Sequence, residues 1–87
     1  MDIVLDNHTK ERANERGISE DEIIDTIENG DNFQAKLNRL GKYKIFPFNN
    51  TRNKVYYKQK RVEVIYFIEK SKIITVTVYA FYGKWEQ

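Results

Sequence analysis

The chain has 87 residues, a net charge of +2 and no cysteine. This length corresponds to a single domain spanning residues 1–87 with a modest core, and the lack of cysteine excludes disulfides and thiolate metal sites. No apolar run approaches the roughly 18 residues of a membrane-spanning helix, and the amino terminus lacks a secretory pattern, so we expect a soluble cytoplasmic protein.

The charges are distributed unevenly along the chain. Residues 1–31 hold ten Asp/Glu and three Lys/Arg, whereas residues 32–87 hold three Asp/Glu and twelve Lys/Arg. In the second part the basic residues alternate with Tyr and Phe, a composition that suits a polyanion whose bases can stack. An ordinary solvated surface around a core is the alternative explanation.

The first predicted helix follows Asp6 or Asn7 as its cap and runs to about Arg16, where Gly17 ends it. Its only interior apolar residue is Ala13, so it has no apolar stripe with which to fill a core. The polar side of this helix therefore needs another explanation.

A basic stripe provides that explanation. His8, Arg12 and Arg16 follow one another at intervals of four, which places them on one face of the helix. Like charges at this spacing cost a helix a few tenths of a kcal/mol per pair, so we expect an external anion to be the reason for the stripe.

The second predicted helix begins at Ser19, which forms a capping box with Glu22, and it ends at Gly30. Ile18 and Ile23 occupy the positions of a hydrophobic staple around this cap. Its buried stripe consists of Ile23, Ile24 and Ile27.

Short strands are predicted from residue 33 onward. Pro47 ends the first, residues 48–53 form a loop, and a hairpin turns around Gln59-Lys60. Residues 32–42 fit either a short helical turn or an irregular edge. A second hairpin turns through Glu69–Lys72. The predicted strands are Tyr43–Phe46, Lys54–Lys58, Arg61–Ile68 and Ile73–Phe81.

Strict alternation in the last strand predicts two different faces. The aliphatic face, which should pack on the isoleucines of the second helix, consists of Ile74, Val76, Val78 and Ala80. The other face consists of Thr75, Thr77, Tyr79 and Phe81. The order of elements predicts an α+β domain in which two N-terminal helices pack on a four-stranded antiparallel sheet.

Several of these residues suit RNA chemistry. His8 can exchange a proton near neutral pH, and Arg12 and Arg16 can bind a phosphate and stabilise its transition-state charge. Thr77 and Tyr79 can donate hydroxyl hydrogen bonds. Each residue also has a structural explanation, since the two arginines can pair with neighbouring acids and the hydroxyl side chains are common in half-buried strands.

A second group lies in the basic hairpin. Tyr57, Lys58 and Arg61 can hold an RNA backbone and stack a base, although lysines there can also protect sheet edges from strand addition. One histidine and no cysteine argue against a zinc site, and the acids of the second helix resemble a solvated face, so we predict no metal or other cofactor.

The motif His8-x3-Arg12-x3-Arg16-Gly17-Ile18-Ser19 resembles the opening of a family of small, mostly uncharacterised bacterial and archaeal domains. Members typically end with a strand reading Ile-Thr-x-Tyr and then Lys-Trp. In this chain Val76-Thr77-Val78-Tyr79 and Lys84-Trp85-Glu86 occupy those places. The layout of the family is similar to that of the RelE and barnase–EndoU–colicin (BECR) ribonuclease toxins.

This resemblance implies a metal-independent endoribonuclease that cleaves RNA by 2′-hydroxyl attack and has a cognate antitoxin or immunity protein. The catalytic residues it implies are His8, Arg12, Thr77 and Tyr79, with Arg16 either in the site or structural. The chain departs from the pattern in the strand of Val62, Val64 and Tyr66, where relatives carry a polar residue or histidine, and at Pro47-Phe48, where they carry Pro-Ser. The alternatives are a non-catalytic RNA-binding or protein-interaction module, and acidic helices that serve as a partner surface.

Overall fold

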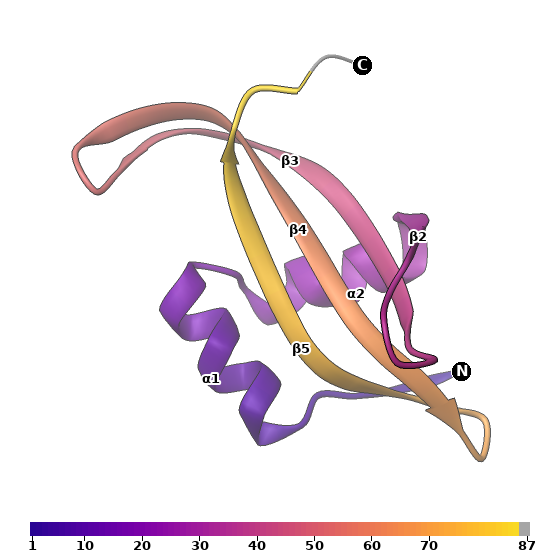
Figure 1. Cartoon of the computed structure of the whole chain (residues 1–87). Coiled ribbons are helices and arrows are strands. Elements are labelled where there is room, and N and C mark those ends of the chain that lie inside the picture. The colour runs from indigo at the N-terminus through magenta and orange to yellow at the C-terminus, as the bar shows by residue number, and fades with distance from the viewer. Residues whose placement is uncertain (86–87) are drawn as a thin grey trace.

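Five strands form one sheet in the order β1-β5-β4-β3-β2, and two helices pack against it (Figure 1). The computed structural model describes residues 1–85. Glu86 of the predicted terminal motif lies outside them. The elements are β1 (Asp2–Val4), α1 (Asn7–Arg16), α2 (Glu20–Asn29), β2 (Asp31–Gln34), β3 (Leu40–Arg52), β4 (Val55–Glu69) and β5 (Lys72–Gly83).

The predicted four-stranded antiparallel sheet is wrong, because the structure is an α+β fold with a five-stranded mixed sheet. The strand β1 pairs parallel to β5, with Ile3 opposite Ile73. The other neighbouring strands are antiparallel. A strand of three residues is too short to show an alternating pattern in the sequence, which is why it was not predicted.

The strands are also longer than predicted. Gln59 and Lys60 lie inside β4 and form no turn; the chain reverses instead at Asn53 and Lys54, whose φ angles are 52° and 68°. Pro47 lies within β3, at a shift in register towards β4, where a bulge tolerates its missing N–H. The uncertain residues 32–42 form the end of β2, a turn and the start of β3.

Both predicted helices and their caps are confirmed. Asp6 caps α1 by accepting from the backbone N–H of Thr9, and Gly17 follows the helix with φ 73°. Ser19 and Glu22 form the reciprocal capping box of α2, and Gly30 follows its end.

A bulge in β5 corrects the predicted faces of that strand. Thr77 lies opposite Ile65 but Thr75 lies opposite Tyr66, so Val76 is an extra residue. The extra residue inverts the alternation before it. Thr75 therefore faces the helices, where it is 1% exposed and its hydroxyl lies 3.3 Å from the carbonyl of Val4.

The core lies between the helices and one face of the sheet. Helix α2 packs on β3 and β4, and α1 runs alongside β5 (Figure 1). The buried residues of this core are Ala13, Ile18, Ile23, Ile27, Val62, Val64, Tyr66 and Val78. No helix among residues 1–85 is long and apolar enough to cross a membrane.

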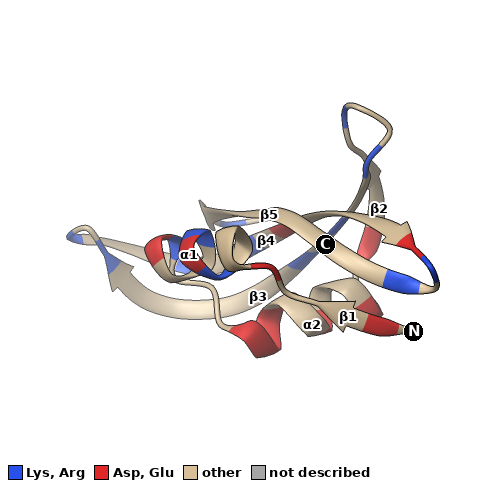
Figure 2. Cartoon of the chain, turned by 90° about the horizontal axis from the view of Figure 1, so that it is seen from below, with Lys and Arg blue, Asp and Glu red and all other residues tan. Residues whose placement is uncertain are grey.

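The other face of the sheet, which we call the open face, is covered by neither helix (Figure 1). The β3–β4 hairpin projects beyond the helices, and Figure 2 shows acidic residues on α2 and β1 with basic residues on the hairpin and the sheet. Acidic residues are thus concentrated on α2, whereas α1 carries both signs.

Candidate nucleic-acid interface

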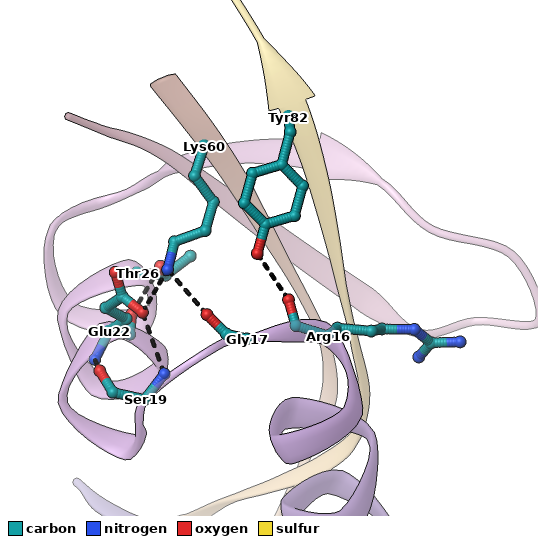
Figure 3. A network of polar contacts seen from close by, with 7 residues as sticks. All are labelled: Arg16, Gly17, Ser19, Glu22, Thr26, Lys60 and Tyr82. Carbon is teal, nitrogen blue, oxygen red and sulfur yellow. Dashed lines mark hydrogen bonds and ion pairs between the residues drawn. The ribbon is translucent and has the colours of Figure 1, made fainter. Parts of the chain in front are cut away.

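The turn between α1 and α2 is held by side chains from the sheet (Figure 3). Lys60, 5% exposed, donates from Nζ to the Gly17 carbonyl and to Glu22 Oε1, each at 2.8 Å. Tyr82 donates from its hydroxyl to the Arg16 carbonyl at 2.7 Å. The carbonyls at the end of a helix lack partners within the helix, so these contacts supply donors to two carbonyls that α1 itself leaves unpaired.

Gly17 is required in this turn for its conformation and for its size. A β-carbon there would lie 2.7 Å from Arg52 Nη1 and 2.8 Å from the Tyr82 hydroxyl. Arg52 also donates to the Glu15 carbonyl at 3.0 Å, which places a cation at the carboxyl end of α1, where the helix dipole favours it. Burial raises the pKa of Tyr82, with nearby Arg52 acting in the opposite direction. Gly17 and Ser19 of the opening motif, together with Glu22, therefore build the turn between α1 and α2, which we call the helical corner.

Arg16 connects α1 to the open face. Its Nη1 donates to the Val78 carbonyl at 2.8 Å, which satisfies a backbone acceptor of β5. Its guanidinium carbon lies 5.0 Å from the centre of the Tyr79 ring, and Tyr79 belongs to the open face. Arg16 thus has a structural bond and also places positive charge beside an exposed aromatic ring.

The other two residues of the stripe are more accessible. His8 is exposed in the first turn of α1, and its imidazole forms no hydrogen bond with residues 1–85. Arg12 donates to Glu15 Oε2 at 2.9 Å, which is one of the pairings expected for it from the sequence. This pair is partly exposed, so it is worth little and does not prevent Arg12 from binding another anion.

The open face presents rows of side chains that cross β3, β4 and β5. Residues opposite one another on neighbouring strands share a face, so the antiparallel register assigns the rows directly. They are Tyr43, Glu63 and Tyr79; Ile45, Arg61 and Phe81; and Pro47, Gln59 and Gly83. Tyr79 is 40% exposed and Phe81 is 48% exposed.

Arg61 occupies the middle of this surface. Its Nε donates to Glu63 Oε2 at 2.9 Å, and its guanidinium carbon lies 3.7 Å from the centre of the Tyr43 ring. The Nη groups of Arg61 donate to no other residue among 1–85. An arginine fixed on an aromatic ring with free N–H groups is well placed to bind a phosphate or to stack a base.

Thr77 and Tyr79 line a groove of about 430 Å³ under the loop between β2 and β3. Phe33 and Ile65 contribute apolar surface to it, and Glu63 contributes a carboxylate. The structure therefore brings Thr77, Tyr79 and the guanidinium of Arg16 to one region.

The remaining predicted residues lie elsewhere. Tyr57 is half-buried, its ring centre 5.7 Å from that of Tyr82, so it supports the helical corner and is not on the open face. Lys58 is exposed and lines a second groove with Trp85. No interaction links His8 directly to Tyr79 among the described residues.

Four further residues had no site role predicted from the sequence: Tyr43, Glu63, Phe81 and Trp85. Phe81 was placed on one face of its strand with Thr77 and Tyr79, and Trp85 in the terminal motif, without a function for either. A signal for Glu63 exists, because it is the one acidic residue between Asp31 and Glu69 and stands two positions from Arg61. In a strand that spacing places both side chains on one face. Val62 and Val64 of this strand, which are buried on its opposite face, were considered in the sequence analysis, whereas Glu63 between them was not.

Comparison with known families adds one finding. A family model described as "Domain of unknown function (DUF4258)" matches residues 5–80. The chain belongs to the DUF4258 family. Neither a curated protein nor a solved structure matches it. The matched segment of this DUF4258 chain includes α1, α2, the helical corner and the part of β5 that carries Thr77 and Tyr79, and it ends before Phe81.

Proposed function

We propose that this DUF4258 protein is a toxin-like endoribonuclease that binds single-stranded RNA across the open face and cleaves it without a metal, by 2′-hydroxyl attack. The observation that carries the proposal is the position of Arg16. Its side chain joins the basic stripe of α1 to the exposed ring of Tyr79. A phosphate beside Tyr79 would thus lie next to the one helix that carries the histidine.

Binding is supported by the composition of the open face. Tyr79 and Phe81 offer exposed rings along β5, and Arg61 lies between them and Tyr43. Stacking of a base on an aromatic side chain is worth about 1–3 kcal/mol, whatever the base, and cations beside the rings bind the backbone. This combination favours a flexible single strand over a stacked duplex.

The proposed reaction needs one group that moves protons and others that stabilise charge. The ribose 2′-oxygen loses its proton to a base and attacks the adjacent phosphorus; the bond to the 5′-oxygen breaks, and that oxygen takes up a proton. His8 is the group we propose for proton transfer, because imidazole changes charge near neutral pH. Arg12 and Arg16 would neutralise the phosphate, and Thr77 and Tyr79 would donate hydrogen bonds to it.

The relationship to the RelE and BECR toxins is part of the same proposal. It is supported by the opening motif and by the Thr77–Tyr79 strand, which places both residues in one groove beside Arg16. It also implies a partner, namely a cognate antitoxin or immunity protein that blocks the RNA surface.

A second candidate is an RNA-binding module without catalysis. The observation in its favour is that the aromatic and basic rows of the open face are complete without α1, so binding there does not require His8.

Cleavage of a single-stranded RNA in excess EDTA, between pH 5 and 8, tests the proposal. We expect the wild type to release products ending in a 2′,3′-cyclic phosphate, and His8→Ala to lose this activity with its circular dichroism unchanged. Lys10→Ala, an exposed change on the same helix, is the matched control and should stay active. Intact RNA with the wild type rules out catalysis, and RNA that is bound but intact supports the second candidate.

A further inference from the structure

A second groove lies at the far end of the open face, where β5 ends. It has a volume of about 460 Å³, and its lining includes Lys58, Lys84, Gln59 and Trp85. The side of this groove formed by β3 carries Ile45 and Pro47. It shares no residue with the groove of Thr77 and Tyr79.

The indole of Trp85 belongs to the open face. Its ring atoms lie 3.6–4.0 Å from the place of a β-carbon on Gly83, a position of the third row. The backbone N–H of Trp85 donates to Gln59 Oε1, from the neighbouring position of the same row. Trp85 therefore extends the aromatic line of Tyr79 and Phe81, whose successive positions are about 6.6 Å apart.

The charge around the groove has one sign. Lys58 and Lys84 are exposed, and neither forms an ion pair with residues 1–85. None of the described lining residues is acidic. The sequence explains why, since residues 32–62 contain nine Lys/Arg and no Asp/Glu. An aromatic ring that shares a groove with two lysines, neither paired with an acid among residues 1–85, fits a base and its neighbouring phosphates.

We propose that this groove binds one nucleotide of a single-stranded RNA, with the base stacked on Trp85 and the adjacent phosphates bound by Lys58 and Lys84. The inference rests on the proposed function for its ligand and adds a binding site separate from the cleavage site. Tyr79, beside which we place the cleaved phosphate, stands four residues from Gly83, a distance of roughly 13 Å along a strand. The site would therefore hold a nucleotide other than those on either side of the bond that is cut.

Trp85 is the one tryptophan in the chain, so its fluorescence reports on this groove alone. The probe is a single-stranded octanucleotide carrying 2′-O-methyl groups, which 2′-hydroxyl attack cannot cleave. We expect saturable quenching of Trp85 fluorescence when the wild type binds the probe. Anisotropy of a labelled probe measures the affinity, which we expect Trp85→Leu to lower by about 5- to 150-fold. Lys58→Ala/Lys84→Ala should reduce the slope of log affinity against log salt by about 1.4.

The matched control is Lys10→Ala/Lys72→Ala, which removes the same charge from exposed positions outside both grooves. Anisotropy that shows binding without quenching of Trp85 would overturn the inference, as would an equal loss of affinity in the two double variants. Failure to bind the probe overturns it as well. Because the probe is not cleaved, quenching with no ribonuclease activity refutes only the proposed catalysis, and cleavage without quenching refutes only this site.

Discussion

The helical corner yields the sharpest prediction about stability, through Lys60→Met. Methionine has a similar length and is apolar, so the substitution removes the ammonium group but keeps most of the packing. Breaking a fully buried ion pair costs about 3–5 kcal/mol. The side chain of Lys60 is 7% exposed but that of Glu22 is 23% exposed, so water can solvate the carboxylate left behind. Glu22 also keeps its bond from the Ser19 N–H.

We therefore expect Lys60→Met to lower the free energy of unfolding by about 2–3 kcal/mol, a value in the range for hydrogen bonds to charged groups. For a domain of this size, that corresponds to a fall in Tm of roughly 8–24 °C. Urea denaturation followed by circular dichroism measures the change. In a double-mutant cycle, Lys60→Met and Glu22→Gln should couple by about 1–2 kcal/mol.

Lys10→Met is the control for this cycle, because it exchanges the same residues at an exposed helical position where the two have similar helix propensity. It should change the unfolding free energy by less than about 0.5 kcal/mol. If Lys60→Met is as mild as this control, or if its effect simply adds to that of Glu22→Gln, the described role of the buried lysine is refuted.

Three further predictions concern the contacts that α1, α2 and the turn between them make. Gly17→Ala should cost about 1–3 kcal/mol in thermal or urea unfolding, because φ is 73° and a methyl group would push aside the ends of Arg52 and Tyr82; a neutral result would contradict the assigned geometry. Tyr82→Phe should cost about 0.5–1.5 kcal/mol through the lost bond to Arg16. Burial raises the pKa of Tyr82, so its contribution to the free energy of unfolding is complete below pH 10 and is lost as the pH rises through the folded pKa. If the stability of Tyr82→Phe declined as steeply at alkaline pH, Tyr82 would not be the source of the decline. The hydrogen bond from Lys44 holds the pKa of Asp25 below its ordinary 3.8. The stability that this pair gives is therefore present above about pH 4 and is lost as the pH falls through the folded pKa. At low salt, Asp25→Asn should weaken the decline of the unfolding free energy at acid pH, and an unchanged decline would count against the pair.

Local chemistry allowed the helices to be predicted from the sequence. Asp6, Gly17 and the pair of Ser19 and Glu22 act on their own neighbours within a few residues, so their spacing alone defines the ends of α1 and α2. Tertiary features escaped this reasoning. Lys60 looked like a turn residue because lysine is rarely buried, and its partners stand 38 and 43 positions away.

The sheet was less predictable for a related reason. A single extra residue at Val76 reverses the faces of β5, and no local signal in the sequence marks it. The structure brings Arg16, Thr77 and Tyr79 into one region, whereas Tyr57 packs against Tyr82, and the roles assigned to all four stay predictions. The long strands decide which side chains share the open face, and their register depends on pairings between distant segments.

The central claim is that RNA lies on the open face of the sheet. Titration of the ¹⁵N-labelled protein with the 2′-O-methyl octanucleotide, followed by backbone amide chemical shifts, tests it most directly. The account predicts that the largest shifts occur at Arg61, Tyr79 and Phe81 and in their rows, while the amides of Glu20–Asn29 in the acidic α2 stay nearly unchanged. Shifts concentrated on α2, or no shifts at saturating probe, would contradict it.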